Sequence, residues 1–296
     1  MRLQTSGETN TLITKGDLPY FDFILDLLAQ NNQSMAKSFG RHVHWGYWRE
    51  PESAICDDDD YARAAEQMTL ELCAAAEIEP GSCVLDAGCG FGGTIASLNE
   101  RLEEMKLIGL NLDERQLGRA RRQVLPINDN RIEFCQGDAC TLPFADSSFD
   151  RVLAVECIFH FPSRQRFFEE AFRVLRPGGI LALSDLVPSA VFLPLARLAA
   201  EAPWLARFRY FGRCDVRYTI GAYRRLAARG RFIPVAERNI TRHTLPTYRY
   251  LPKLLRRIAA LQGTTAGTAD LVVILRALGA LGLLNYYLMA FRKPGA

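Results

Sequence analysis

The chain has 296 residues, of which 49% are hydrophobic and 23% are charged, and its 36 basic side chains nearly balance 33 acidic ones. Such a chain can bury about three quarters of its unfolded surface, which argues for one main domain with appended pieces. Glu8 and Asp17 precede any apolar run and argue against a secretory signal. Eight cysteines without a Cys-x-x-Cys pair or zinc-type spacing favour reduced thiols in the cytoplasm and no metal.

Residues 1–78 are predicted to form an N-terminal helical cap. Apolar side chains recur at helical spacing from Asp17 to Ala29. Residues 41–48, Arg-His-Val-His-Trp-Gly-Tyr-Trp, are too aromatic for an ordinary linker. For Trp45 and Trp48, one interpretation is an aromatic cluster that pins the N-terminal helix to the core.

An apolar strand that runs into a dense glycine turn is the most informative motif of the chain. Residues 84–93 read Val-Leu-Asp-Ala-Gly-Cys-Gly-Phe-Gly-Gly. Gly88, Gly90 and Gly93 let the backbone turn tightly and approach a ligand, and the helix that begins near Gly93 points its amide dipoles at that ligand. This spacing alone also fits dinucleotide binding. Asp86 sharpens the interpretation, because it would repel a dinucleotide phosphate and attract an ammonium or sulfonium group.

Strands and helices alternate from residue 80 to residue 186. An amphipathic helix at 164–175 is stopped by Pro177-Gly178-Gly179. Strands are predicted at 84–87, 107–112, 132–139, 151–155 and 180–185. This alternation predicts an α/β fold with a doubly wound, Rossmann-like, mostly parallel sheet, and ligands of such sheets bind at the carboxyl ends of the strands.

A helical lid is predicted over residues 187–283, between the core at 79–186 and a C-terminal edge strand at 284–296. Within the lid, a helix that ends at Gly230 and a strand at 232–239 are expected to rejoin the sheet. The apolar segment 271–284 is too short to span a membrane and carries Arg276 at its centre. We therefore expect a packed helix there.

The glycine motif resembles the first motif of class I S-adenosylmethionine-dependent methyltransferases, and the segments that follow keep this resemblance in order over about residues 40–186. The resemblance implies S-adenosylmethionine as the cofactor and a seven-stranded sheet with an antiparallel last strand at its edge. The lid is similar to this family only loosely.

The same resemblance implies a set of cofactor-binding residues. Asn111 stands where the family usually has an acid for the ribose. A non-acidic residue followed by Gln116 is typical of the branch that includes rebeccamycin sugar O-methyltransferase and γ-tocopherol methyltransferase. Asp138 and Ala139 would lie at the adenine, and Tyr47, in a His-x-Gly-Tyr-Trp segment, near the methionine end. The full expected set is Tyr47, Asp86, Gly88, Gly90, Asn111, Gln116, Asp138, Ala139 and Glu156.

A histidine and an aspartate are the candidate catalytic pair. His160 comes four residues after Glu156, just past the end of the fourth strand, and Asp185 ends the fifth. Adjacent parallel strands would bring both to the methyl side of the cofactor. The similar sugar O-methyltransferases carry the same pattern, which implies His160 as general base and Asp185 as the acid that orients it. The structural alternative is that His160 caps a helix and Asp185 merely ends a strand.

The lid is unusually basic. Residues 206–259 contain 14 lysines and arginines but only two acidic residues, Asp215 and Glu237. This excess suits an anionic acceptor, an anionic membrane surface or a solvated basic face. Nucleic acid is not expected, because no motif that reads DNA or RNA accompanies the charge.

The predicted function is methyl transfer to a small natural-product or isoprenoid-like acceptor, anionic or hydrophobic, with oxygen as the favoured atom. The alternatives are C- or N-methylation of a prenyl, quinol or phosphate-bearing acceptor, a non-catalytic small-molecule-binding protein, and a nicotinamide-dependent oxidoreductase. The oxidoreductase would need an acid at position 111 and none at 86, and the chain has the opposite. Peripheral membrane contact and a homodimer are further expectations.

Overall fold

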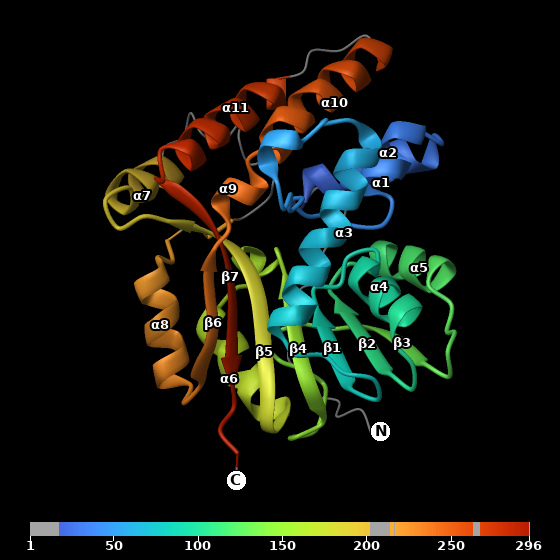
Figure 1. Ribbon diagram of the computed structural model, residues 1–296, viewed down its shortest axis with the longest axis vertical. Helices are drawn as coiled ribbons and strands as arrows, with labels where there is room; N and C mark the ends of the chain where they lie inside the picture. The colour runs from blue at the N-terminus through green and yellow to red at the C-terminus, as the bar shows by residue number, and fades with distance from the viewer. Residues whose placement is uncertain (1–17, 202–213, 216, 263–266, 296) are drawn as a thin grey trace.

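A seven-stranded sheet with the order β3-β2-β1-β4-β5-β7-β6 forms the centre of the computed structural model, which describes residues 18–201, 214–215, 217–262 and 267–295 (Figure 1). The strands are β1 (Cys83–Ala87), β2 (Lys106–Asn111), β3 (Arg131–Gln136), β4 (Phe149–Val155), β5 (Leu175–Pro188), β6 (Ile233–Asn239) and β7 (Leu284–Arg292). The first five pair in parallel, and β7 is antiparallel to both β5 and β6. The predicted mostly parallel sheet with an antiparallel last strand is confirmed.

The position predicted for the C-terminal strand at the sheet edge is wrong. β7 lies between β5 and β6, and β6 is the outer strand. The physical reason is that β7 is apolar on both faces: Leu288, Met289 and Ala290 are fully buried, so this strand needs neighbours on both sides. β6 is mostly exposed and suits an edge.

Successive residues of the strands face two separate cores. Val84 and Leu153 join the core under α3 (Asp58–Ala75) and α4 (Gly93–Arg101), while Leu85 and Val152 join the core under α6 (Arg164–Val174) and α8 (Ile220–Arg229). α5 (Glu114–Gln123) packs on β2 and β3. Burial on both faces is what the continuous apolar strands predict.

A helical cap covers the carboxyl ends of the parallel strands (Figure 1). Its members are α1 (Pro19–Ala29), α2 (Gln33–Phe39), η1 (Pro51–Ser53), α7 (Leu193–Glu201), α9 (Thr241–Thr244), α10 (Thr247–Gln262) and α11 (Gly267–Ala280). The N-terminal part and the lid pack on each other, since Tyr61 stacks on Tyr250 at 4.5 Å and the indole N–H of Trp45 donates to the Tyr248 hydroxyl at 3.1 Å. The two predicted pieces therefore form one cap.

The apolar segment near the C-terminus forms α11 and the start of β7. Within the described ranges, no helix is long and apolar enough to cross a membrane.

Phe168 offers a test of the core behind the sheet. It lies on α6, is 1% exposed, and contacts the rings of Tyr223, Phe232 and Phe291. We expect Phe168→Ala to lower the free energy of unfolding by about 3–5 kcal/mol, because the cavity would lie between α6, α8, β7 and the residue before β6 and could not collapse easily. Leu195→Ala, at a 58% exposed position, should change it by less than about 0.5 kcal/mol. Urea denaturation measures both, and equal stabilities would contradict this packing.

Candidate active site

The glycine turn after β1 forms the floor of a cavity. Gly88 has φ +87°, in the left-handed region that favours glycine, and a Cβ there would meet the Cys157 sulfur at 2.7 Å. Gly92 caps α4 with φ +79°. Any side chain at 88 would therefore strain the turn and crowd the end of β4, as the glycine motif predicts.

Asp86 is buried beside this turn without a full set of partners. Its side chain is 1% exposed, and no hydrogen bond reaches its Oδ1 from the described part of the chain. Burial raises the pKa of Asp86 to about 7, against a hydrogen bond from the Thr94 side chain. A buried carboxylate oxygen without a donor is costly, and a cationic group placed beside it would offset that cost.

The cavity above the turn, called the glycine cavity here, contains all but one of the predicted cofactor residues. It is lined by Asp86, Gly88, Gly90, Asn111, Gln116, Asp138, Ala139 and Glu156, among others. At the end of β2, the Asn111 amide donates to the Gln116 side chain at 2.9 Å. The pairing of these two amides provides a polar edge in the place expected for a ribose.

Tyr47, predicted near the methionine end of the cofactor, is the exception. It lines neither this cavity nor the next one. Its ring stacks on His243 at 4.6 Å, and its hydroxyl accepts a hydrogen bond from Arg238 at 3.3 Å. The aromatic segment does reach the cavity, but through His42, Val43 and His44. Trp45 and Trp48 are buried in the cap, as the aromatic-cluster interpretation predicts.

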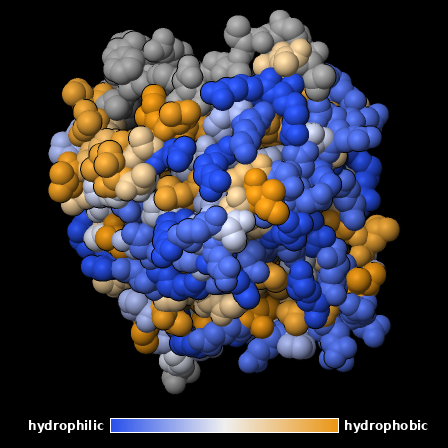
Figure 2. All heavy atoms as spheres, turned by 45° about the horizontal axis from the view of Figure 1, so that its top comes forward, coloured by the Kyte–Doolittle hydropathy of each residue, from blue (hydrophilic) through white to orange (hydrophobic). Residues whose placement is uncertain are grey.

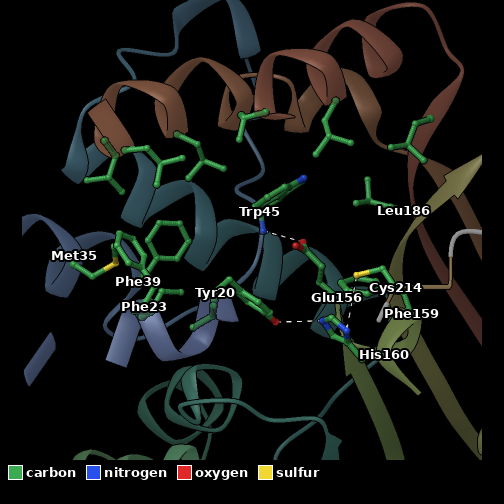
Figure 3. A pocket seen from close by; sticks show the side chains of 18 residues that line it. Tyr20, Phe23, Met35, Phe39, Trp45, Glu156, Phe159, His160, Leu186 and Cys214 are labelled. Carbon is green, nitrogen blue, oxygen red and sulfur yellow. Dashed lines mark hydrogen bonds between the residues drawn. The ribbon is translucent and has the colours of Figure 1, made fainter. Parts of the chain in front are cut away.

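A second cavity, the apolar cavity, lies between the cap and the sheet (Figure 3). No lysine or arginine belongs to its lining among the described residues. Its wall comes from α1, α2, α10, α11 and the ends of β5 and β7, with Phe23, Ile24, Phe39, Leu251, Leu254, Val272, Leu275 and Leu284 among the side chains. Sequence patterns missed this cavity, because the apolar periodicity of these helices is the same whether they cover a core or a ligand.

Four residues line both cavities and therefore mark their junction: Tyr20, Val43, Glu156 and His160. Three of them carry polar groups, so the junction is the polar end of an otherwise apolar space. Tyr20 was not singled out by sequence, and the only available signal is its place at the start of the predicted N-terminal helix.

Glu156 is held firmly at the junction. Its backbone has φ +48°, and its Oε2 accepts hydrogen bonds from the Trp45 N–H at 2.8 Å and from the Tyr286 hydroxyl. Enclosure under the cap raises the pKa of Glu156 to about 8. The left-handed backbone of a non-glycine residue at a strand end is typical of functional sites.

His160 ends the short helix η2 (Ile158–His160). Its Nε2 lies 3.3 Å from the Tyr20 hydroxyl, and its Nδ1 lies 4.0 Å from the Cys214 sulfur (Figure 3). The imidazole thus lies at the junction of the two cavities.

The predicted contact between His160 and Asp185 is absent from the described structure. Asp185 is fully buried and accepts hydrogen bonds from Arg164, at 2.9 Å, and from the Tyr223 hydroxyl. The alternation of β5 explains this, because Asp185 shares its face with Leu181 and Leu183, which point toward α6 and α8. Asp185 therefore joins β5 to those helices and lines neither cavity.

Some of the basic lid residues pair with acids. Five described arginines of the lid bind acids, three of which belong to the N-terminal part: Arg238 with Glu71, Arg242 with Glu52, Arg257 with Asp58, Arg224 with Glu237, and Arg217 with Asp215. Arg207, Arg209 and Arg213 of the predicted basic set lie outside the described residues. Part of the excess charge thus serves the contact between the two pieces of the cap.

Comparison with known proteins supports the chemistry of this site. A sequence model of the family described as methyltransferase domain matches residues 85–183. The chain is 31% identical over 281 residues to 27-O-demethylrifamycin SV methyltransferase of Amycolatopsis mediterranei, with 93% of this chain and 95% of that protein covered. It is 40% identical over 177 residues to methyltransferase GfsG of Streptomyces halstedii, with 60% of this chain and 62% of that protein covered.

The solved structures agree on the fold. Mycolic acid cyclopropane synthase CmaA1, complexed with SAH and CTAB, matches with a TM-score of 0.73 at 17% identity, covering 94% of this chain and 96% of that one. The sheet and the glycine cavity thus define a Rossmann-like methyltransferase fold. The chain belongs to the S-adenosylmethionine-dependent methyltransferases and is an enzyme that transfers methyl groups to small molecules.

The glycine cavity fits S-adenosylmethionine. The unsatisfied Oδ1 of Asp86 suits the cationic methionine part, and the paired amides of Asn111 and Gln116 suit hydroxyl groups. Among the described residues, no group of three or more His, Cys, Asp or Glu side chains is arranged to hold a metal ion.

The raised pKa of Asp86 allows the cofactor site to be tested by the pH dependence of ligand binding. Binding of a cationic group requires the ionised carboxylate, so S-adenosylhomocysteine affinity should rise as the pH increases through about 7. We expect Asp86→Asn to weaken binding by about 10- to 100-fold, the loss typical of a hydrogen bond to a charged group, and to flatten this pH dependence. Isothermal titration calorimetry measures both effects.

Asp59→Asn, at an exposed position, is the matched control and should bind normally. NAD binding without a response to S-adenosylhomocysteine would contradict this assignment.

Proposed function

We propose that the enzyme methylates an oxygen atom of an apolar small molecule, and that transfer takes place where its two cavities meet. This proposal rests on the observation that four residues line both the glycine cavity and the apolar cavity: Tyr20, Val43, Glu156 and His160. A methyl donor in the first and an acceptor in the second would have their reactive ends together only at this junction.

S-adenosylmethionine, when bound, supplies an electrophilic methyl group on a sulfonium sulfur. The chain's part is to bind the donor through Asp86, Asn111, Gln116 and Asp138 and to align the acceptor. Alignment in a near-attack arrangement accounts for most of the rate enhancement expected of such a displacement.

His160 is the proposed general base. Among the three polar groups at the junction, its imidazole is the one suited to accept a proton near neutral pH. Burial raises the pKa of the Tyr20 hydroxyl, so Tyr20 stays neutral. Glu156 has a pKa raised to about 8 and its Oε2 already accepts two hydrogen bonds. These properties favour His160 for removal of the acceptor's hydroxyl proton.

An apolar acceptor fits the cavity better than an anionic one. No described lysine or arginine lines the apolar cavity, so a phosphate or diphosphate there would lack a counter-charge. Two similar proteins support this choice, since CmaA1 is complexed with CTAB in its crystal structure and another relative is a methyltransferase of 27-O-demethylrifamycin SV.

C-methylation is the second candidate, and Glu156 is the observation that favours it. A carbon nucleophile such as an alkene becomes cationic when it accepts a methyl group, and Glu156 at the junction would stabilise that charge once it is ionised, above its raised pKa of about 8. N-methylation has no such feature. Mass spectrometry and NMR of the labelled product would distinguish an O-methyl from a C-methyl group.

The surface near the lid also supports the expected peripheral membrane contact. Hydrophobic side chains gather at the upper left of Figure 2, the side on which α7 and α11 lie in Figure 1. The exposed apolar residues of this region are Val191, Leu195, Leu198, Val273, Ile274 and Leu281. A membrane contact, a homodimer and a cytoplasmic location all stay predictions.

Removal of the proposed base should slow the chemical step. We expect His160→Ala to lower kcat by about 10²- to 10⁴-fold with little change in S-adenosylhomocysteine affinity, because the base acts only in the transition state. The loss should be smaller for acceptors with more acidic hydroxyls. The measurement is a labelled-methyl transfer assay over hydroxylated macrolides, sterols, fatty acids and simple sugars.

His243→Ala, which removes an imidazole outside both cavities, should retain its activity. If His160→Ala keeps most of its turnover, the base assignment is wrong and catalysis rests on alignment alone.

The acceptor cavity can be tested with a pair of neighbouring residues. Val272 lines the apolar cavity and is 2% exposed, whereas Val273 points outward and is 49% exposed. We expect Val272→Phe to fill the cavity, raising the KM of an apolar acceptor and weakening binding of the neutral fluorescent probe N-phenyl-1-naphthylamine at least about 10-fold, the cost of overpacking a closed site.

Val273→Phe should change neither quantity, and S-adenosylhomocysteine affinity should stay normal in both variants. Equal effects of the two substitutions would place the acceptor elsewhere.

A further inference from the structure

We propose that Arg164 is a positioning residue for the acceptor: its guanidinium fastens the lid at Asp215 to β5 and so shapes the reactive end of the apolar cavity. Arg164 lines neither cavity, so it acts through the residues that it holds. The inference rests on the proposed function of the apolar cavity as the acceptor site. It also gives Asp185 a role other than the predicted one of orienting the base.

The Arg164 side chain joins four parts of the chain inside the protein. It begins α6 and is 1% exposed. Its Nη2 donates to Oδ2 of Asp185 in β5, at 2.9 Å, and to the backbone carbonyl of Asp215 in the lid, at 2.8 Å. Its Nε donates to the hydroxyl of Tyr223 on α8 at 2.8 Å, and the ring of Tyr218 lies 4.3 Å from its central carbon. One guanidinium thus holds α6, β5, α8 and the lid together.

The residues that Arg164 holds lie directly behind the wall of the apolar cavity. Asp215 follows Cys214, and its backbone N–H donates to the carbonyl of Phe159 at 2.9 Å. Asp185 precedes Leu186, whose backbone N–H donates to Oδ1 of Asp185 at 2.8 Å. Three neighbours of this network line the apolar cavity: Phe159, Leu186 and Cys214. The network therefore lies one residue behind the surface that an acceptor would contact.

This part of the wall is at the end of the cavity where transfer is proposed. In Figure 3, Phe159 and Cys214 lie next to His160 and Glu156, on the opposite side from Phe39. His160 and Glu156 also mark the junction with the glycine cavity. The reacting oxygen has to lie at this end, within about 3–3.5 Å of the methyl group, and a misplacement of about 1 Å can lower the rate about 100-fold. The position of this wall therefore matters for alignment.

The buried ion pair of Arg164 with Asp185 is explained better by position than by stability. Removing two charges from water offsets most of their attraction, and apolar residues of similar volume are often equally or more stabilising. A planar guanidinium with five N–H groups, however, fixes the directions of several partners at once. Neither an apolar side chain nor a lysine can do this. The network therefore specifies where β5, α8 and the lid meet.

Exchange of the arginine for lysine tests this directional role. Arg164→Lys keeps the positive charge but presents a single ammonium, which cannot reach all three hydrogen-bond partners together. We expect kcat/KM for an apolar acceptor to fall about 10- to 100-fold, because a displaced wall misaligns the reacting oxygen. The affinity for N-phenyl-1-naphthylamine should fall at least about 5-fold, whereas S-adenosylhomocysteine should bind within about 2-fold of normal, because its cavity shares no partner with Arg164. Transfer assays, fluorescence titration and calorimetry measure these quantities.

Arg173→Lys is the matched control. Arg173 lies on the same helix, binds the carboxylates of Glu170 and Asp146 at 2.8 and 2.9 Å, and lines neither cavity. Its replacement should lower the free energy of unfolding, measured with urea, and leave kcat/KM and probe affinity normal, because it holds the other end of α6. An equal loss of probe affinity in both variants would be a general effect of stability and would overturn the proposal.

Two smaller changes keep the test valid if Arg164→Lys does not fold. Asp185→Asn removes the charge of one partner, and Tyr223→Phe removes the hydroxyl of another. Each should lower probe affinity in the same direction but less far. Where Arg164→Lys folds, its combination with either change should give losses that are less than additive, since all of them act through one guanidinium. Additive losses would contradict the inference.

The probe separates this inference from the proposed function. Unchanged probe affinity in Arg164→Lys would overturn the inference, whatever the acceptor. If probe affinity falls as expected while kcat/KM of every active acceptor stays normal, the cavity wall depends on Arg164 as inferred. In that case it is the placement of the acceptor in the apolar cavity that is wrong.

Discussion

The buried carboxylate of Asp86 is the constraint around which the site is arranged. It lies at the end of β1. The glycine turn that follows leaves a cavity beside this carboxylate, because Gly88 and Gly90 have no side chains that could fill it. Between the ordinary pKa of an aspartate and the raised value of about 7, increasing pH lowers the folding stability, because the carboxyl ionises in the unfolded chain but stays protonated where it is buried. A bound cation would offset that cost, so the buried carboxylate suits a positively charged ligand.

The cap completes this arrangement from two distant parts of the chain. Acids of the N-terminal part meet arginines of the lid, as in the pair of Glu71 with Arg238. Such half-exposed ion pairs contribute at most about 1 kcal/mol each, so their main effect is to set which surfaces meet. The apolar contacts beneath them, including Tyr61 on Tyr250, supply the stability.

The parts of the site that follow from a single strand end could be predicted from sequence. Asp86, the paired amides of Asn111 and Gln116, and the position of His160 each depend on one local pattern. Tyr20 could not be predicted in this way, because its contact with His160 depends on how a helix docks 140 positions away in the chain.

Two residues of the predicted site, Asp185 and Tyr47, lie outside both cavities, and the local geometry of the chain explains why. Asp185 shares the parity of Leu181 and Leu183, so its side chain had to face the helices behind the sheet. Tyr47 lies in the right segment, but the chain turns inward at His42 and His44, and Tyr47 packs on the lid. The apolar cavity could not be predicted from the sequence, because leucines that face a ligand follow the same helical spacing as leucines that face a core.

The insertion of β7 between β5 and β6 has a consequence for how the protein is made. Ile180 of β5 pairs with Arg292, and β6 is joined to the sheet only through β7. During synthesis, α8 and β6 leave the ribosome before the strand that attaches them exists. The nascent chain must therefore hold an open apolar edge on β5 until β7 has emerged, which makes synthesis of this strand the step that closes the sheet.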